Sequence, residues 1–161
     1  MPMSANTQKE TFQILIEDTL GEEGDYDTIR NIHETLNELI EEHKEEPEPL
    51  QLDKTDVRKV FEQSGVSAER MEQFDRNYEE TAGEKTSLLA ANIAETKKFQ
   101  IETPDVVIKV NPERSDLIET RMIDGRQCLV IAVDDHIEVN GVNVRTLKQI
   151  QHMEEEMNKN I

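Results

Sequence analysis

The chain has one cysteine and no tryptophan in 161 residues, and only four phenylalanines and two tyrosines. A single cysteine excludes an internal disulfide bond. Cys128 lies in the apolar run CLVIAV, where we expect a buried and unreactive thiol. Because large aromatic side chains are few, we expect a modest and mainly aliphatic hydrophobic core.

The sequence also has no long apolar segment, no signal-peptide pattern and no lipidation motif. We therefore expect a cytoplasmic protein that does not bind a membrane. It contains no phosphate-binding loop, no GxSxG, no HExxH and no cysteine and histidine pairs at metal-binding spacing. These absences predict no cofactor and favour a non-catalytic protein.

Basic residues are outnumbered, with 18 Lys and Arg against 36 Asp and Glu, for a net charge of −18. Residues 1–97 carry 24 of the acidic and 10 of the basic side chains, so the excess lies mainly there. A negative field of this size repels phosphate backbones and anionic lipids. We expect no nucleic-acid ligand, and a protein partner or a homodimer instead.

Helical periodicity dominates residues 1–97. Apolar residues recur every three or four positions over residues 7–20 and again from Asp25, a good N-cap, to about residue 46. Pro47 and Pro49 predict an extended linker. Asp53 and Ser67 are N-caps for two further helices, which Gly65 separates. His33 and His43, ten residues apart on one helix, are interpreted as surface histidines rather than metal ligands.

The capacity to form a sheet is concentrated in residues 99–144. Leu, Ile, Val and Phe make up 17 of these 46 residues, against 40 in the whole chain. Asp124-Gly125 and Asn140-Gly141 are favoured dipeptides for two-residue type I′ turns and predict two hairpins. The first turn pairs residue 123 with 126, and the second pairs residue 139 with 142. Residues 126–133 are mostly apolar on both faces, which predicts a central strand.

These patterns predict an α+β fold, with amino-terminal amphipathic helices, a small antiparallel sheet of hairpins and a closing helix. We divide the chain into an acidic helical region (1–97), an antiparallel β region (98–145) and a carboxy-terminal helix (146–161). We expect the three regions to form one compact unit.

One weak catalytic candidate consists of Asp105, Glu119 and Arg121. An Asp on a strand and a Glu two residues before a Lys hold a divalent metal in a large nuclease superfamily, and the pattern here is similar. Arg121 stands where that arrangement has lysine, and a guanidinium does not act readily as a proton acceptor. We therefore favour the alternative that Glu119 and Arg121 form a solvated or mutually paired patch.

A weak metal-site candidate is the run Asp134, Asp135 and His136, which places three possible ligands in one turn. Adjacent acidic residues at a strand end are more often an ordinary turn. The sequence offers no identifiable fourth ligand, so we predict no metal site here.

The segments TPDVVIKVNPERSDLIETRMIDGRQCLVI and EVNGVNV, together with FQILIEDTLG, IHETLNELIEEHKEE and SGVSAERMEQF, resemble a known family. Over about residues 10–145 the chain is similar to the carboxy-terminal part of bacterial proteins described as domain of unknown function 4317. The resemblance implies a source among Gram-positive, often gut-dwelling anaerobes, and longer relatives with an additional amino-terminal region. It implies no reaction, ligand or catalytic residue.

We therefore expect a non-catalytic interaction or regulatory module of a cytoplasmic bacterial protein. The alternative is a metal-dependent phosphodiesterase or nuclease-like site on the sheet.

Overall fold

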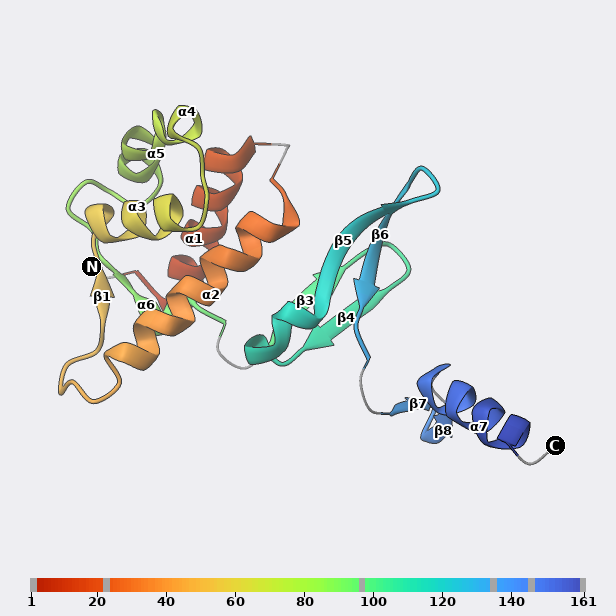
Figure 1. The fold of residues 1–161 in the computed structure, drawn as a ribbon. Coiled ribbons are helices and arrows are strands. Elements are labelled where there is room, and N and C mark those ends of the chain that lie inside the picture. Colours follow the sequence, from red (N-terminus) through yellow and green to blue (C-terminus); the bar gives the residue numbers. More distant parts are fainter. Residues whose placement is uncertain (1–2, 22–23, 96–97, 134–135, 145–146, 160–161) are drawn as a thin grey trace. The chain divides into compact units, whose positions relative to one another are not determined.

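The structure is a computed structural model that describes residues 3–21, 24–95, 98–133, 136–144 and 147–159. The chain forms two compact units, unit 1 (Met1–Asp116) and unit 2 (Leu117–Ile161), and each is described by itself. The predicted α+β class is confirmed, because helices come first, two-stranded antiparallel hairpins follow, and a helix ends the chain (Figure 1).

Unit 1 begins with helices whose ends follow the capping signals of the sequence. The side chain of Asp25 accepts a hydrogen bond from the Thr28 N–H, and Asp53 and Asp56 form a reciprocal capping box. The predicted helix after Ser67 is two short helices with a turn at Glu72–Gln73. The helices described in unit 1 are α1 (Ala5–Leu20), α2 (Tyr26–Glu42), α3 (Lys54–Gln63), α4 (Ala68–Met71), α5 (Phe74–Thr81) and α6 (Ala90–Ile93).

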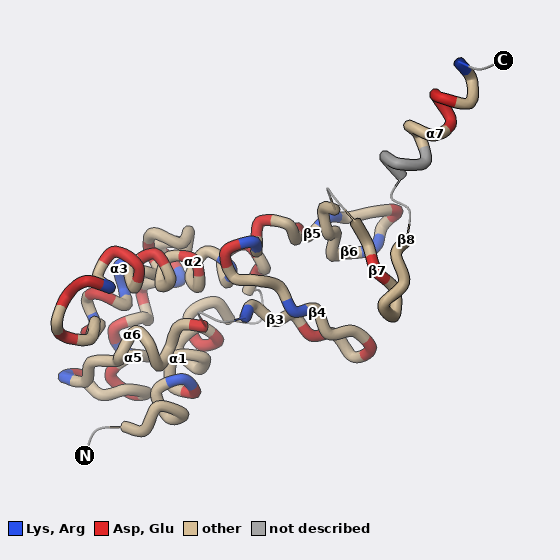
Figure 2. The backbone as a smooth tube through the Cα atoms, turned by 90° about the horizontal axis from the view of Figure 1, so that it is seen from below, with Lys and Arg blue, Asp and Glu red and all other residues tan. Residues whose placement is uncertain are grey.

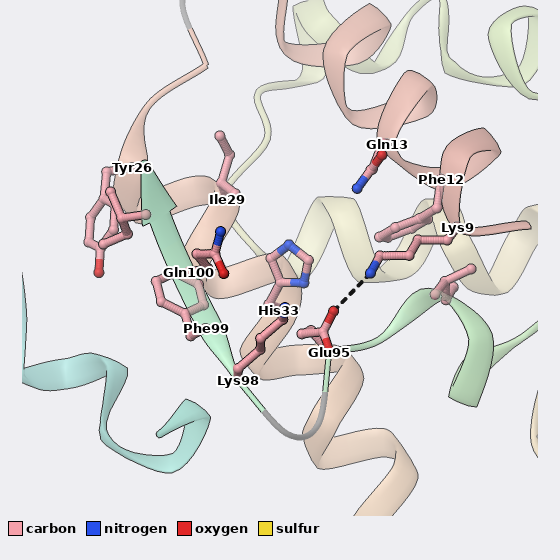
Figure 3. A pocket seen from close by; sticks show the side chains of 12 residues that line it. Lys9, Phe12, Gln13, Tyr26, Ile29, His33, Glu95, Lys98, Phe99 and Gln100 are labelled. Carbon is pink, nitrogen blue, oxygen red and sulfur yellow. Dashed lines mark hydrogen bonds and ion pairs between the residues drawn. The ribbon is translucent and has the colours of Figure 1, made fainter. Parts of the chain in front are cut away.

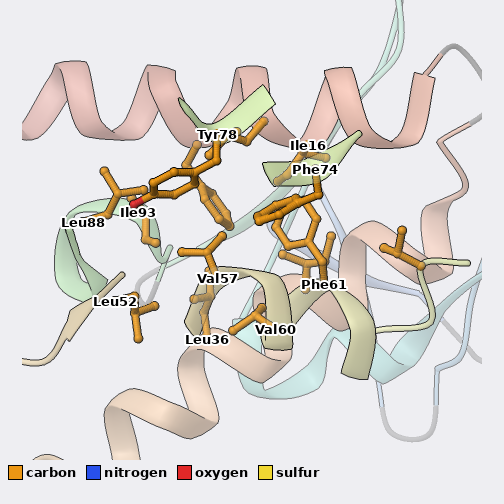
Figure 4. Packing of buried hydrophobic residues seen from close by; sticks show 14 of the residues in the cluster. Ile16, Leu36, Leu52, Val57, Val60, Phe61, Phe74, Tyr78, Leu88 and Ile93 are labelled. Atoms are coloured by element: carbon orange, nitrogen blue, oxygen red, sulfur yellow. The ribbon is translucent and has the colours of Figure 1, made fainter. Parts of the chain in front are cut away.

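A hydrophobic core cluster lies among these helices, and its buried side chains belong to residues 12–93 (Figure 4 shows part of it). Ile118 of unit 2 is also fully buried. Phe61 is at its centre, with the Phe12 ring 5.9 Å away and the Phe74 ring 5.1 Å away, both in edge-on geometry. Edge-to-face aromatic pairs contribute about 0.5–1.5 kcal/mol each beyond the area they bury. Four of the six Phe and Tyr side chains, Phe12, Phe61, Phe74 and Tyr78, therefore contribute to helix packing in this cluster.

Two short ladders complete unit 1. Strand β1 (Gln51–Leu52) pairs with β2 (Leu88–Leu89), and β3 (Phe99–Glu102) pairs with β4 (Val107–Val110), both antiparallel. The buried Gln8 of α1 accepts a hydrogen bond from the Leu89 N–H at 2.9 Å, which fixes the β2 segment against α1. The β1–β2 ladder was not predicted from the sequence.

Unit 1 extends to Asp116, beyond the boundary at residue 97 that composition suggested. The reason is that residues 98–116 contact α2. The ring of Phe99 packs against Tyr26 and His33, and the Ser115 hydroxyl donates a hydrogen bond to the Glu34 carboxylate at 2.7 Å. A 3₁₀ segment (Pro112–Leu117) then leads into unit 2. That the regions form one compact unit stays a prediction.

Unit 2 contains two hairpins and a helix. Strand β5 (Ile118–Ile123) pairs with β6 (Arg126–Ile131), β7 (Ile137–Val139) pairs with β8 (Val142–Val144), and α7 (Leu147–Lys159) follows. The predicted registers are confirmed, with Ile123 opposite Arg126 and Val139 opposite Val142. Positive φ angles at Asp124 (50°), Gly125 (78°), Asn140 (49°) and Gly141 (81°) are those a type I′ turn requires.

The prediction that residues 126–133 form a central strand is wrong. Among the described strands, β6 pairs with β5 alone, so its outer edge has no neighbour. Cys128 is half-buried rather than fully buried as expected, and among the described strands its hairpin has two strands only. In the described residues, no helix has both the length and the apolar character needed to cross a bilayer.

Candidate functional site

A pocket of about 440 Å³ opens in unit 1 between α1, α2 and the described residues 93–95 and 98–101 (Figure 3). Its walls come from three parts of the sequence, near Phe12, near Ile29 and near Phe99. Pockets that hold small ligands measure roughly 300–1,000 Å³ and are mostly apolar with a few polar groups. We call this space the α1–α2 pocket.

Aromatic rings form one wall of the α1–α2 pocket. The Phe99 ring lies 6.1 Å from the Tyr26 ring at an interplanar angle of 78°, and 6.2 Å from the His33 imidazole at 76°. Both are edge-to-face contacts, which orient the rings rather than leave them free to turn. Phe99 is the first residue of β3, so the start of that strand fixes this wall.

His33 is the most unusual polar residue of the pocket. Burial lowers the pKa of its imidazole, an effect that the Glu95 carboxylate opposes and the Lys9 ammonium reinforces. The ring is therefore neutral at pH 7, with one nitrogen as donor and the other as acceptor. Its Nδ1 is buried and has no hydrogen-bond partner in the part of the chain that the structure describes.

Charged side chains lie beside this imidazole. Lys9 Nζ and Glu95 Oε2 form an ion pair at 3.0 Å, and both side chains are partly exposed, at 49% and 32%. The amide of Asn37 donates a hydrogen bond to the Glu95 backbone carbonyl at 3.4 Å, which holds Glu95 against α2. Lys98 also lines the pocket and is exposed. Among the described residues, two cations and one anion therefore line a pocket of a strongly acidic chain.

Tyr26 forms the far side of the aromatic wall. The guanidinium carbon of Arg30 lies 5.7 Å from the centre of the Tyr26 ring, within range of a cation–π contact. Burial raises the pKa of the Tyr26 phenol, and the charge of Arg30 opposes the shift. The phenol thus stays protonated over the physiological range, and Tyr26 adds apolar surface and no charge to the pocket.

The catalytic candidates named from the sequence fall in different units. Asp105 lies in the turn between β3 and β4 of unit 1, not on a strand, and is exposed. Glu119 and Arg121 lie on the same face of β5 in unit 2, and the guanidinium of Arg121 donates a hydrogen bond to the Glu119 carboxylate. This contact supports the interpretation of Glu119 and Arg121 as a locally paired surface patch.

The metal candidates are only partly described. Asp134 and Asp135 lie outside the described residues. His136 is exposed, with its Nε2 3.7 Å from the Glu138 carboxylate. Among the residues that the structure describes, no three His, Cys, Asp or Glu side chains are close enough together to hold a metal ion.

A second surface of interest lies in unit 2. Strands β7 and β8 place Ile137, Val139, Val142 and Val144 on one face of their hairpin, and we call these four side chains the β7–β8 apolar face. Their exposed fractions are 36%, 55%, 66% and 40%. A two-stranded hairpin is marginally stable alone and needs further strands or a packing layer. This face is therefore suited to contact another surface.

The sequence interpretation missed the α1–α2 pocket and took His33 for a surface histidine. A signal was present, because His33 follows Ile29 by four positions and so lies near the apolar stripe of α2. His43, by contrast, has its Nδ1 2.8 Å from the backbone carbonyl of Leu39 in its own helix. The sequence alone does not show that Phe99, 66 residues further along the chain, packs against His33.

Comparison with known proteins gives one match. A family model described as "Domain of unknown function (DUF4317)" matches residues 1–142, which is most of the chain. The match begins at residue 1 rather than at about residue 10, so the resemblance extends further toward the amino terminus than expected. No curated protein and no solved structure matches the chain.

Proposed function

We propose that the chain, which belongs to the DUF4317 family, is a non-catalytic interaction module that self-associates through unit 2. We further propose that it acts in the bacterial cytoplasm. The family description carries no activity, so the proposal rests on the chain's own residues.

The observation that carries the proposal is the uneven distribution of buried and exposed apolar side chains. The hydrophobic core cluster belongs to unit 1. Of the thirteen large apolar side chains that are exposed in the described residues, ten belong to unit 2. Large contiguous patches of exposed apolar side chains often mark sites of protein–protein interaction. The β7–β8 apolar face is the most ordered example, since all four side chains point the same way.

A second copy of the chain is the partner that the charges favour. Residues 1–116 carry 28 acidic and 13 basic side chains, net −15, whereas residues 117–161 carry 8 and 5, net −3. Figure 2 marks the acidic and basic positions of the described residues in red and blue. Contact through unit 2 therefore brings together the least repulsive parts of two copies. Identical hairpins can also pair about a twofold axis, where each apolar face covers the other.

Sedimentation velocity of the full chain over a concentration series tests the proposal. We expect a species of twice the monomer mass of 18.6 kDa to grow with concentration. Added salt should strengthen it, because screening weakens repulsion between two chains of net charge −18. A monomer at every concentration and every salt level would overturn the proposal.

The rival function is a metal-dependent phosphodiesterase that uses Asp105 and Glu119. It makes a separate prediction, namely that Mg²⁺ or Mn²⁺ raises the melting temperature and that Asp105→Ala abolishes the increase. A ligand at a hundred times its dissociation constant adds about 2.7 kcal/mol of stability. The turn position of Asp105 and the pairing of Glu119 with Arg121 favour the interaction module over this rival.

A further inference from the structure

The α1–α2 pocket has the dimensions of a small-molecule site. Its volume of about 440 Å³ exceeds what a few water molecules fill and lies within the range for organic ligands. It lies in unit 1, among elements that the core and the α1-to-β2 hydrogen bond of Gln8 hold in place. The site is thus separate from the surface proposed for self-association.

The walls of the pocket select for an apolar body. The edge-to-face group of Tyr26, Phe99 and His33 provides a flat aromatic surface, and Phe12 and Ile29 contribute from α1 and α2. Figure 3 shows these side chains arranged around the same space. A planar ring or a branched aliphatic group would be covered by carbon on several sides.

His33 supplies a directional hydrogen-bond donor. Its buried Nδ1 lacks a partner, and a buried acceptor without a partner is tolerated better than a buried N–H without one. We therefore assign the proton of the neutral ring to Nε2, the other ring nitrogen. The neutral His33 ring, which lines the pocket, carries one N–H, and a ligand with a hydrogen-bond acceptor would satisfy it.

The charged side chains of the pocket indicate which charge the ligand's hydrogen-bond acceptor should carry. Lys9 is already paired with Glu95 at 3.0 Å, so these two charges largely compensate. Lys98 adds one further positive charge at the exposed edge. A ligand with a single negative charge would meet both the Lys98 ammonium and the His33 donor, and it would do so in a chain whose overall field repels anions elsewhere.

We propose that the α1–α2 pocket binds a small organic monocarboxylate with an aromatic or branched apolar body. Its apolar part lies against Phe99 and Tyr26, and its carboxylate accepts from His33 Nε2–H and pairs with Lys98. The site requires no metal and no covalent step.

A matched pair of probes tests this assignment. Indole-3-acetate and indole-3-acetamide have nearly the same shape, and only the first carries a charge. Each is titrated to about 5 mM into the ¹⁵N-labelled full chain, which detects dissociation constants near 1 mM. We expect saturable amide shifts around residues 29–33 and 98–101 with the acetate, and binding at least tenfold weaker with the acetamide. The pKa of His33 should rise on binding, because a nearby carboxylate favours the imidazolium.

A matched pair of variants separates the pocket from general charge effects. Lys98→Gln should weaken the acetate about three- to tenfold, whereas Lys85→Gln, at an exposed lysine outside the pocket, should leave it unchanged. Equal binding of both probes would overturn the carboxylate preference. Shifts confined to residues 117–159, or no saturable shifts at all, would overturn the site. None of these results depends on whether the chain self-associates.

Discussion

Val139 and Val142 lie directly opposite each other across the β7–β8 hairpin, and both side chains are more than half exposed, at 55% and 66%. The Asn140-Gly141 turn fixes this register by local chemistry alone. The hairpin therefore forms its ladder without acquiring a core of its own. If another apolar surface covers both valines, their apolar area is removed from water, and this burial stabilises the contact.

The capping box of α3 provides a test of the helical unit. Asp53→Ala removes the side chain that accepts from the Asp56 N–H, so we expect a loss of about 1 kcal/mol and a melting temperature lower by about 2–4 °C. Asp105→Ala is the matched control, because it removes the same charge from an exposed turn. Thermal unfolding followed by circular dichroism measures both, and equal shifts would show that the cap contributes nothing.

Tyr78 predicts a sensitivity to alkaline pH. Its hydroxyl donates a hydrogen bond to the Thr86 carbonyl, and burial raises the pKa of Tyr78 to about 12, with Asp53 and Asp56 adding to the shift. An unfolded tyrosine ionises near pH 10. The contribution to stability is therefore complete below pH 10 and is lost as the pH rises toward 12.

Tyr78→Phe is the variant that isolates this effect. At pH 9 we expect it to be about 1 kcal/mol less stable than the wild type, because the Thr86 carbonyl loses its donor. Between pH 10 and 12 the difference should shrink. Urea unfolding at each pH measures it, and a difference that stays constant would mean that Tyr78 ionises normally.

His33 predicts the opposite dependence at acid pH. Burial lowers the pKa of the folded imidazole, so below about pH 6.5 the unfolded chain binds the proton more readily than the folded chain does. As the pH is lowered below about 6.5, the free energy of unfolding should therefore decrease more steeply in the wild type than in His33→Gln. Identical slopes for the wild type and His33→Gln would contradict this prediction.

The parts of the fold that the sequence predicts well depend on neighbouring residues. Asp25 and Asp53 cap helices through N–H groups three residues away, and the two turn dipeptides fix their registers over a few residues. The β1–β2 ladder joins residues 51 and 89, and no local pattern indicates which segment pairs with a two-residue strand. The apolar side chains on both faces of β6 predicted a central strand. That pattern does not show whether the surface that would cover these side chains comes from the same chain or from another one.

The candidate sites show the same limit. Glu119 and Arg121, two residues apart on one strand, are paired as the sequence suggested. The α1–α2 pocket could not be predicted, because it brings together Lys9, His33 and Glu95 from positions up to 86 residues apart. Helical periodicity shows that His33 lies near the apolar stripe of α2, but only the packing of Phe99 determines its burial.

Sedimentation equilibrium of Val142→Glu against Asn143→Glu tests self-association through the β7–β8 apolar face. The two variants add the same charge at adjacent positions of β8, the first on the β7–β8 apolar face and the second on the opposite, polar face. We predict that Val142→Glu weakens self-association at least tenfold, which corresponds to about 1.4 kcal/mol, and that Asn143→Glu stays close to the wild type. Equal weakening by both variants, or none by Val142→Glu, would contradict self-association through this face.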